Sequence, residues 1–492
     1  MSKYRGGSRV RIVKRERVNG RPTTKLVKHI GTARNEEELE ILKMIAETDR
    51  SRIEEASQLR FDFSNGVPRG LFTIGVHHYG SELVLGAIFD SLGISIGRLT
   101  PLLRLLTIAR IIHPGSKRNT ATWIKDSLGS GYSLDQIYRF LDAVYKNRSK
   151  IVSSMKEFVT TSYPSFMSYL LYDVTTIYFE TDREDDDGIR KRGYSKDHHS
   201  DLPQVVLGLC VNELGMPLSF RLYPGHTYEG ATLTDSVVEI RDQLGNRPVT
   251  VVADAGMLSA KNIALLKEQN LSFVISARIK NLDQSTTSEI LSHDFTGSAL
   301  FETRYNKDRL IVTYSENRAR ADRRRRERSV ARLRRLIAEN KALRRHPFLE
   351  FRLDGKVQLD DRAIERASKF DGLKGYLTNN LEMSPDDFIF HYSQLPMVEQ
   401  SFRMTKSDLK IRPSFHFRTR RIESHVLLCM ISLCVMRILE QKLKPYGYTY
   451  RAAIEIIDKT NSAIIGNTRK THLIPPIYNE DFKAITKALD LN

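Results

Sequence analysis

Two acidic side chains stand in stretches whose other residues favour buried β-strands. Asp173 lies inside YLLYDVTTIYFE, and Asp254 follows TVVA. Burying an isolated carboxylate is costly unless a cation, a metal ion or solvent meets it. A third acid, Glu399, comes shortly after Pro396, a residue that suits the first turn of a helix, where the helix dipole favours an ionised carboxylate. Together the three acids form a set of hard oxygen ligands.

Hard oxygen ligands suit Mg²⁺ or Mn²⁺, which take carboxylates and water. A metal-dependent nuclease in which Asp173, Asp254 and Glu399 are catalytic and hold two such ions is therefore one hypothesis. In a two-metal site, one ion generates the attacking oxygen of a phosphodiester cleavage and the other stabilises the leaving oxygen. Each acid also has a simpler explanation, because an Asp at a strand end often caps a turn and a first-turn Glu often complements the helix dipole. Asp173, in mid-strand, has few such explanations.

The charge balance of the chain favours a polyanionic partner. The 492 residues carry a formal net charge of +18. Segment 316–345 holds 12 Arg and 1 Lys against 4 acids, a balance of +9 and half of the excess. An excess of this size is typical of nucleic-acid binding, although composition does not distinguish DNA from RNA. We expect this segment to form a helix that contacts phosphates without sequence preference, through Arg323, Arg324, Arg325 and Arg326.

Other bulk properties narrow the class of protein. With 40% hydrophobic and 28% charged residues, the chain is expected to be globular and to have more than one domain. Its three cysteines are too few for a disulfide framework and are expected to be buried thiols in a reducing compartment. No signal peptide is expected at the N-terminus. The apolar run from His425 reaches Arg437 too soon to span a bilayer, so it is expected to be a buried helix, with no membrane partner.

The elements that must position the acids follow from the hydrophobic patterns. Residues 9–30 are expected to form a β-hairpin, since Asn19-Gly20 suits its turn, and helices are expected at 35–59 and over 75–165. Beyond Pro164 three strand candidates follow in quick succession, SYLLYDVTTIYFE, QVVLGLCVNE and PLSFRLYP. A helix is expected at about 231–244, and strands and helices then alternate, which predicts an α/β core. The expected segments are a basic hairpin (1–34), a helical DNA-binding lobe (35–165), the first part of the core (166–278), an insertion with the Arg-rich helix (279–370), the second part of the core (371–445) and a tail (446–492).

Four blocks of the sequence resemble the DDE transposases of bacterial and archaeal insertion sequences, in the IS4-like group and its IS1634-type branch. The blocks are YDVTTIYFE, KRGYSKDHHSDLPQVVLGLCVNELGMPLSFRLYPGHTYEGATL, VVADAGMLSAKNIALL and HYSQLPMVEQSFRMTKSDLKIRP, and the segment HPGSK also fits. The resemblance implies an α/β fold with an RNase H-like catalytic core and an inserted subdomain, preceded by a basic β-hairpin and an all-helical lobe. It places the two aspartates and the glutamate of the family on Asp173, Asp254 and Glu399.

The family signature around the glutamate reads Tyr, two residues, Arg, three residues, Glu, six residues, Lys. Tyr392, Glu399 and Lys406 fit this spacing, whereas Leu395 occupies the Arg position. The seven residues from Glu399 to Lys406 are close to two helical turns, so both side chains are expected on one face. The resemblance implies that Tyr392 positions DNA and that Lys406 holds its phosphates. Either Arg403 substitutes for the missing Arg, or the binding of the DNA end is weakened.

The function implied by the resemblance is transposition. Metal-dependent hydrolysis at the ends of the element would free a 3′-hydroxyl, which then attacks target DNA without a covalent protein–DNA intermediate. The implied partner is double-stranded DNA, as terminal inverted repeats and as target. A homodimer or larger oligomer is implied in the synaptic complex, and the implied location is the prokaryotic cytoplasm, at the nucleoid. Two alternatives remain, a catalytically silent DNA-binding protein derived from a transposase and an RNase H-like nuclease without strand transfer.

Overall fold

The computed structural model describes most of the chain. Two longer stretches, 48–71 and 237–248, lie outside the described residues. The shorter gaps are 1, 5–6, 19–20, 34, 37, 41, 44–45, 129–130, 186–187, 196–198, 200, 234, 258, 340, 342–344, 353–355, 467–470, 475 and 492. The expected helices at 35–59 and 231–244 therefore fall largely outside the described part.

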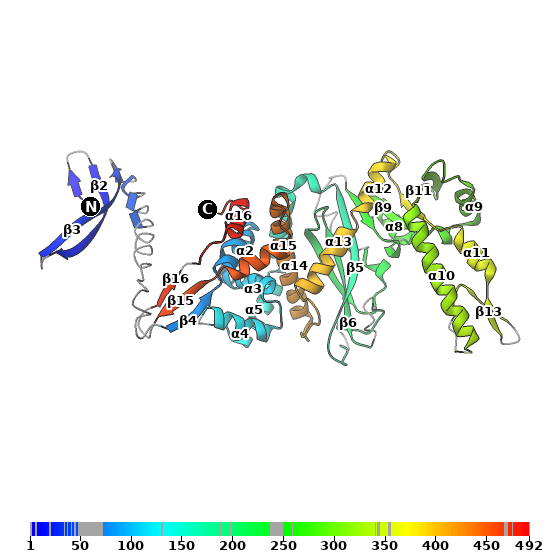
Figure 1. Ribbon diagram of the computed structural model, residues 1–492, viewed down its shortest axis with the longest axis horizontal. Coiled ribbons are helices and arrows are strands. Elements are labelled where there is room, and N and C mark those ends of the chain that lie inside the picture. The colour runs from blue at the N-terminus through cyan, green and yellow to red at the C-terminus, as the bar shows by residue number, and fades with distance from the viewer. Residues whose placement is uncertain are drawn as a thin grey trace. The chain divides into compact units, whose positions relative to one another are not determined.

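The described chain forms two compact units, residues 1–76 with 462–476, and residues 77–461 with 477–492. The described residues of the first unit form two three-stranded sheets. In one of them Val18 stands opposite Arg21, which confirms the predicted hairpin, although Asn19 and Gly20 of its turn are not described. The strands of these sheets, labelled in part in Figure 1, are β1 (Ser2–Tyr4), β2 (Gly7–Val18) and β3 (Arg21–Ala33), and β4 (Phe72–His77), β15 (Ser462–Gly466) and β16 (Thr471–Ile474).

Helices form the second unit between Tyr79 and Ser162, whereas the described part of 35–76, which was expected in the same lobe, belongs to the first unit and includes a strand. Helix α5 has one apolar face, where Ile137, Phe140, Leu141 and Val144 are buried at helical spacing. Between α3 and α4 the chain breaks at HPG, because Pro cannot continue a helix. The helices are α2 (Tyr79–Ser91), α3 (Thr100–Ile112), α4 (Lys117–Leu128), α5 (Leu134–Lys146) and α6 (Arg148–Ser162).

The long apolar helix α14 (Thr419–Leu443) joins this lobe to the sheet. It packs against α2, α3, α5 and α6 and against a strand of the central sheet. It has the length and hydropathy of a membrane span, yet 94% of its most apolar window is buried inside the protein. The predicted buried helix is thus confirmed, and Cys429 and Cys434 on it are buried, free thiols, as is Cys210.

A mixed sheet of eight strands carries the second unit, in the order β10-β11-β14-β9-β8-β5-β6-β7. Three of the predicted strands, β5 (Tyr169–Tyr178), β6 (Gln204–Val211) and β7 (Pro217–Pro224), pair antiparallel in chain order. On the other side of β5, β8 (Thr250–Ala253) and β9 (Ser272–Ala277) run parallel to it, joined by α8 (Ala260–Glu268). Every residue of β6 is buried, as expected for a strand covered on both faces.

The segment predicted as an insertion contributes strands to the same sheet. β10 (Leu300–Tyr305) and β11 (Asp308–Tyr314) pair antiparallel and continue the sheet through β14 (Leu373–Thr378) to β9. The Arg-rich helix α10 (Glu316–Ala338) is present as predicted. The remaining elements of this region are α9 (Gln284–Ser292), β12 (Leu349–Phe351), β13 (Val357–Leu359) and α11 (Asp361–Ser368), and those of the C-terminal part are α12 (Pro385–Ser393), α13 (Pro396–Arg403), α15 (Tyr450–Lys459) and α16 (Glu480–Ala488).

A buried arginine of α14 fixes helix α13 against the sheet. The guanidinium of Arg437 donates to Met397 O at 3.1 Å and Ser401 Oγ at 2.8 Å, and pairs with Glu440 at 2.7 Å. Ser401 Oγ in turn donates to Gly215 O at 2.9 Å, in the turn between β6 and β7. A side chain on Gly215 would come within 2.7 Å of the guanidinium, and its φ of +73° favours glycine.

We predict that Gly215→Ala lowers the free energy of unfolding by about 2–4 kcal/mol, since it adds both backbone strain and a clash with Arg437. The matched control is Gly93→Ala. Gly93 has a similar φ of +64°, but a methyl group there meets no atom within 4 Å, so only the strain, about 1 kcal/mol, is expected. Urea denaturation of both variants measures the difference. Equal losses would contradict the proposed close packing around Arg437.

Candidate active site

The two predicted aspartates lie on neighbouring parallel strands. In the register of β5 and β8, Tyr172 stands opposite Ala253, so Asp173 and Asp254 each follow that pair by one residue. Parallel neighbours are about 4.8 Å apart and aligned residues point to the same face. Asp173 is half-buried and its Oδ1 accepts from Val174 N at 2.8 Å, while Asp254 is exposed where β8 ends. The fold therefore brings these two acids together.

Glu399 reaches the same region from α13. The helix begins at Pro396, as predicted, and Glu399 is exposed in its first turn. α13 packs against β5 and β6, the strand of Asp173 and its neighbour. Arg437 and Ser401 hold α13 in this position through the contacts described above.

Lys374 on β14 lies close enough to Asp254 and to Glu399 for both carboxylates to influence its pKa. Burial, followed by the nearby charge of Arg318, lowers the pKa of Lys374 to about 8, and the carboxylates of Asp254 and Glu399 act in the opposite direction. The ammonium also lies 4.1 Å from the ring centroid of Tyr392. Lys374 could not be identified from the sequence, because nothing in GLKGYLTNN marks its lysine as a neighbour of two distant acids.

Tyr392, one of the signature residues, stands beside Asp254. Its hydroxyl donates a long hydrogen bond of 3.5 Å to Asp254 Oδ1. Burial, together with the charge of Asp254, raises the pKa of this phenol above its ordinary value, so it stays protonated and remains a donor. Tyr376 packs edge-on against its ring at 4.6 Å. Tyr392 is buried, and its hydroxyl makes this polar contact with Asp254.

A cavity of about 610 Å³ opens beside Asp254. Its wall includes Thr175 of β5, Arg278 at the end of β9, and Glu229, an acid that the sequence analysis did not single out. A methyl group on Gly256 would come within 3.2 Å of Glu229 Oε2, which places this carboxylate close to the turn after Asp254. Tyr194 and Tyr228, 81% and 67% exposed, also border the cavity. Carboxylates, a cation and exposed aromatic rings thus surround one recess.

The donor chemistry of these acids fits the predicted Mg²⁺ or Mn²⁺ ions, which take carboxylate oxygens. Asp173 and Asp254 each come one residue after a pair of opposed residues on neighbouring strands. The carboxylates of Asp254 and Glu399 both raise the pKa of Lys374. Among the residues that the structure describes, however, no three His, Cys, Asp or Glu side chains are close enough to form a ready-made metal cage. The two aspartates are brought together by the sheet, and Glu399 belongs to a separate helix.

The other signature positions differ from a regular helical arrangement. Leu395, which replaces the signature Arg, is buried in the core. Arg403 is exposed at the end of α13 and lines a separate cavity with Gln400 and Tyr450. A π-helical turn, η6 (Met404–Asp408), follows α13 and contains Lys406. The expectation that Glu399 and Lys406 share a face assumed a continuous α-helix, and a π turn changes that register.

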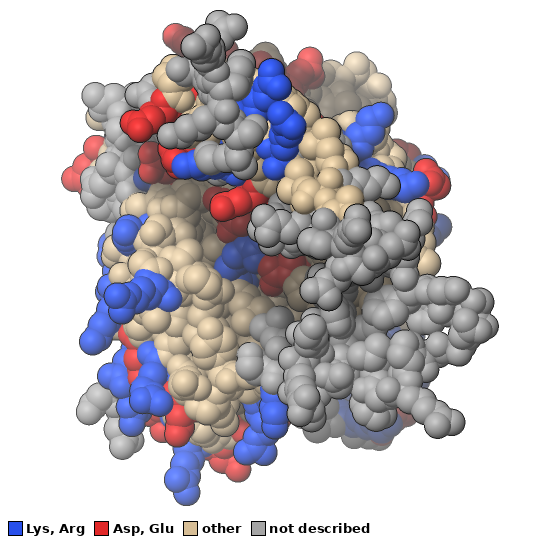
Figure 2. Space-filling model, turned by 90° about the vertical axis from the view of Figure 1, so that its left-hand side faces the viewer, with Lys and Arg blue, Asp and Glu red and all other residues tan. Residues whose placement is uncertain are grey.

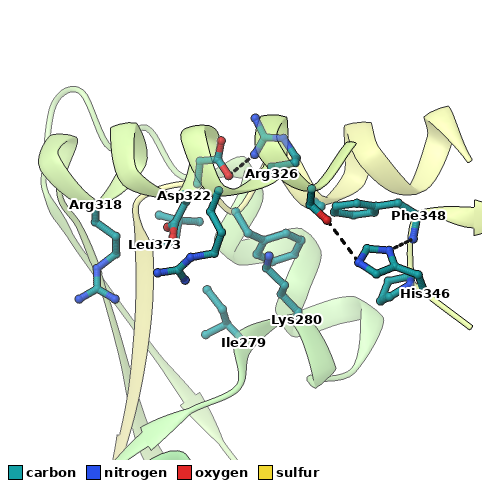
Figure 3. Close-up of a pocket in the computed structure, with 14 residues that line it drawn as sticks. Ile279, Lys280, Arg318, Asp322, Arg326, His346, Phe348 and Leu373 are labelled. Carbon is teal, nitrogen blue, oxygen red and sulfur yellow. Dashed lines mark hydrogen bonds and ion pairs between the residues drawn. The ribbon is translucent and has the colours of Figure 1, made fainter. Parts of the chain in front are cut away.

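The Arg-rich helix α10 borders a second recess, of about 450 Å³. Lys280, Arg318 and Arg325 line it. Figure 3 shows Lys280 and Arg318 with His346 and Phe348 around one hollow. Arg326, predicted to contact DNA, instead pairs with Asp371, and both side chains are largely buried. Arg323 and Arg324 are exposed, as Arg325 is. The charge of Arg318 also lowers the pKa of Lys374, so this basic surface extends to the candidate active site.

Basic side chains also occur on other faces of the protein. Figure 2 shows Lys and Arg side chains spread over the face drawn there, with Asp and Glu among them. The exposed arginines of α10 are therefore one of several basic features of the surface.

A family model described as "Transposase DDE domain" matches residues 164–435, more than half of the chain. Among solved structures, the chain is similar to a piggyBac transposase in a synaptic complex with hairpin DNA. The likeness has a TM-score of 0.39 and 10% sequence identity, over 80% of this chain and 82% of that one. No curated protein matches the chain.

We predict that Asp254→Asn lowers the pKa of Lys374 below about 8, because it removes a negative charge that favours the ammonium. Arg318→Gln is expected to raise the same pKa, since it removes a repelling cation. The pH dependence of lysine acylation, followed at Lys374 by mass spectrometry, measures both. Asp361→Asn, an exposed acid at the start of α11, is the control and should leave the pKa unchanged. An unchanged pKa in the first two variants would contradict the proposed proximity.

Proposed function

The chain belongs to the DDE transposase family, and from this premise we propose that it is the transposase of an IS4-like, IS1634-type insertion sequence. In this proposal it hydrolyses phosphodiesters at the ends of its element and joins the freed 3′-hydroxyl to target DNA. The observation that carries the proposal is the alignment of Asp173 and Asp254 on paired parallel strands, beside a helix that presents Glu399.

We further propose that the catalytic core is RNase H-like. The strand order β7-β6-β5-β8-β9 supports this, with three antiparallel strands in chain order followed by two strands parallel to the first. Strands β14, β11 and β10 then extend the sheet beyond β9. In such a core the central strand and its parallel neighbour carry the two aspartates side by side.

Asp173, Asp254 and Glu399 would hold the two divalent ions. When bound, these ions lower the pKa of the attacking water and neutralise charge on the phosphodiester. Lys374 places a cation beside Asp254 and Glu399, and with a pKa of about 8 it is mostly charged at pH 7 and loses that charge as the pH rises above 8. Tyr392 donates to Asp254 and orients its carboxylate. Arg278, exposed on the wall of the cavity, can pair with a DNA phosphate.

The proposed partner is double-stranded DNA, both as the inverted repeats of the element and as the target. The exposed arginines of α10 and the recess beside them support this choice, because phosphate contacts provide most of the sequence-independent affinity for DNA. A homodimer or larger assembly would bring two DNA ends together, in the prokaryotic cytoplasm at the nucleoid.

One observation favours a second candidate, a catalytically silent DNA-binding protein. Leu395 occupies the position of the signature Arg and is buried, so it cannot bind a DNA phosphate. A nuclease without strand transfer is the third candidate. Arg403, exposed on the same helix as Glu399, is the residue that we propose in place of the missing Arg.

We predict that Asp173→Asn, Asp254→Asn and Glu399→Gln each lower the rate of cleavage by about 10³-fold or more, since each removes a charge that binds the ions. The assay is cleavage and joining of a DNA fragment that carries both ends of the element, with Mg²⁺. Glu480→Gln is the matched control, because Glu480 is also an exposed first-turn glutamate, in α16.

The outcomes for the unaltered protein separate the three candidates. Cleavage followed by joining is expected for a transposase. Binding of the ends without cleavage would favour the silent protein, and cleavage without joining would favour the nuclease. Full activity of any of the three acid variants would contradict the assignment of that residue.

We also predict that replacing Arg323, Arg324 and Arg325 together with Gln weakens binding to DNA of any sequence. The slope of log K against log salt should fall by about 0.9 for each phosphate contact that is lost. The matched control removes three exposed lysines, Lys459, Lys483 and Lys487, and so changes the net charge equally. Titrations at several salt concentrations measure both slopes. Equal changes in the two variants would show that only net charge matters.

A further inference from the structure

Four basic side chains are buried together between the helical lobe and the segment that follows α13. They are Arg110 at the end of α3, Lys117 at the start of α4, His416, and His425 on α14, and they are 3–6% exposed. Lys117 Nζ lies 3.4 Å from His425 Nδ1. We call this group the basic pocket.

The four groups of the basic pocket disfavour one another's charged forms. Burial is the largest cause of a lowered pKa for all four groups, and the neighbouring cations lower the pKa of Lys117, His416 and His425 further. The Cys429 thiol is the acidic group that raises the pKa of Lys117 and Arg110. Burial in turn raises the pKa of this thiol. Buried cations without a carboxylate partner destabilise a fold unless an anion compensates them.

A cavity of about 500 Å³ adjoins these side chains. Within the described residues, Arg110 Nη2 and His416 Nδ1 are buried and have no hydrogen-bond partner. Arg110 Nη1 makes only a long contact of 3.4 Å to Leu409 O. Gly115 and Ser116, which precede α4, line the cavity, so the N-terminus of this helix also adjoins it. Donors, cations and a helix N-terminus are the features that bind a phosphate group.

We propose that the basic pocket binds a phosphate group, and that its source is the backbone of bound DNA. The choice of DNA rests on the proposed function. The segment that leaves Glu399 through α13 and η6 reaches the cavity at Lys410 and Arg412, both of which line it. The same segment is attached to the strand of Asp173, because Ser414 N donates to Tyr178 O at 3.1 Å. A DNA strand that leaves the active site along this segment would bring a phosphate to the pocket. A free phosphate ion has the same chemistry and is the other possible source.

The first test measures the melting temperature of the full-length protein against inorganic phosphate, with sodium chloride at matched ionic strength as reference. For the unaltered protein we expect a saturable rise of about 1–3 °C. Lys117→Met should melt higher than the unaltered protein without phosphate, since a buried charge is replaced by an apolar side chain, and should lose the response. Arg110→Met is the second variant. Lys125→Met, an exposed lysine on the same helix, is the control and should keep the response.

The second test identifies the source of the phosphate. Affinity for a duplex of mixed sequence should fall about 10-fold in Lys117→Met, and by less than about 2-fold in Lys125→Met. A response to phosphate with unchanged duplex affinity would support a free ion and overturn the assignment to DNA. No response in the unaltered protein, or an equal response in Lys117→Met, would overturn the pocket itself. Neither test needs cleavage, so failure of the proposed enzyme activity is distinguished from failure of this proposal.

Discussion

Parallel hydrogen bonding between β5 and β8 is the constraint on which the candidate active site depends. It sets Tyr172 opposite Ala253, and so brings Asp173 and Asp254, 81 residues apart in sequence, to the same level of the sheet. A shift of one residue would move one aspartate to the opposite face. Both β5 and β8 are interior strands of the sheet. Pairing of β5 with the fully buried β6, and of β8 with β9, therefore holds them in this register.

Basic side chains have different roles in this protein, although all contribute to its net charge. Arg437 and Arg326 are paired with Glu440 and Asp371 and hold elements of the fold together. Lys374 stands beside two acids of the candidate site, whereas Arg110 and Lys117 are buried without a carboxylate among the charges that act on them. The net charge of the chain therefore overstates how much basic surface is available to DNA. The position of each cation decides its role.

Local patterns predicted the hairpin, the strands around both aspartates and the start of α13 at Pro396, because turn residues, strand composition and a first-turn Pro act over a few residues. Contacts between distant segments could not be predicted in this way. Strands β10 and β11 continue the core sheet, although their sequence shows only short strands. Lys374 and the basic pocket could not be predicted in this way either. In the pocket, for example, Lys117 and His425 are 308 residues apart in the chain. The π turn at Lys406 has no marker in the sequence that would distinguish it from α-helix.

The central claim is that three acids from separate elements share divalent ions. A crystal structure of the protein soaked with Mn²⁺, with anomalous scattering used to locate the metal, tests this most directly. Our account predicts anomalous density contacted by the carboxylates of both Asp173 and Asp254, with Glu399 close enough to complete the site. Density elsewhere on the protein, or none near these aspartates at saturating Mn²⁺, would contradict it.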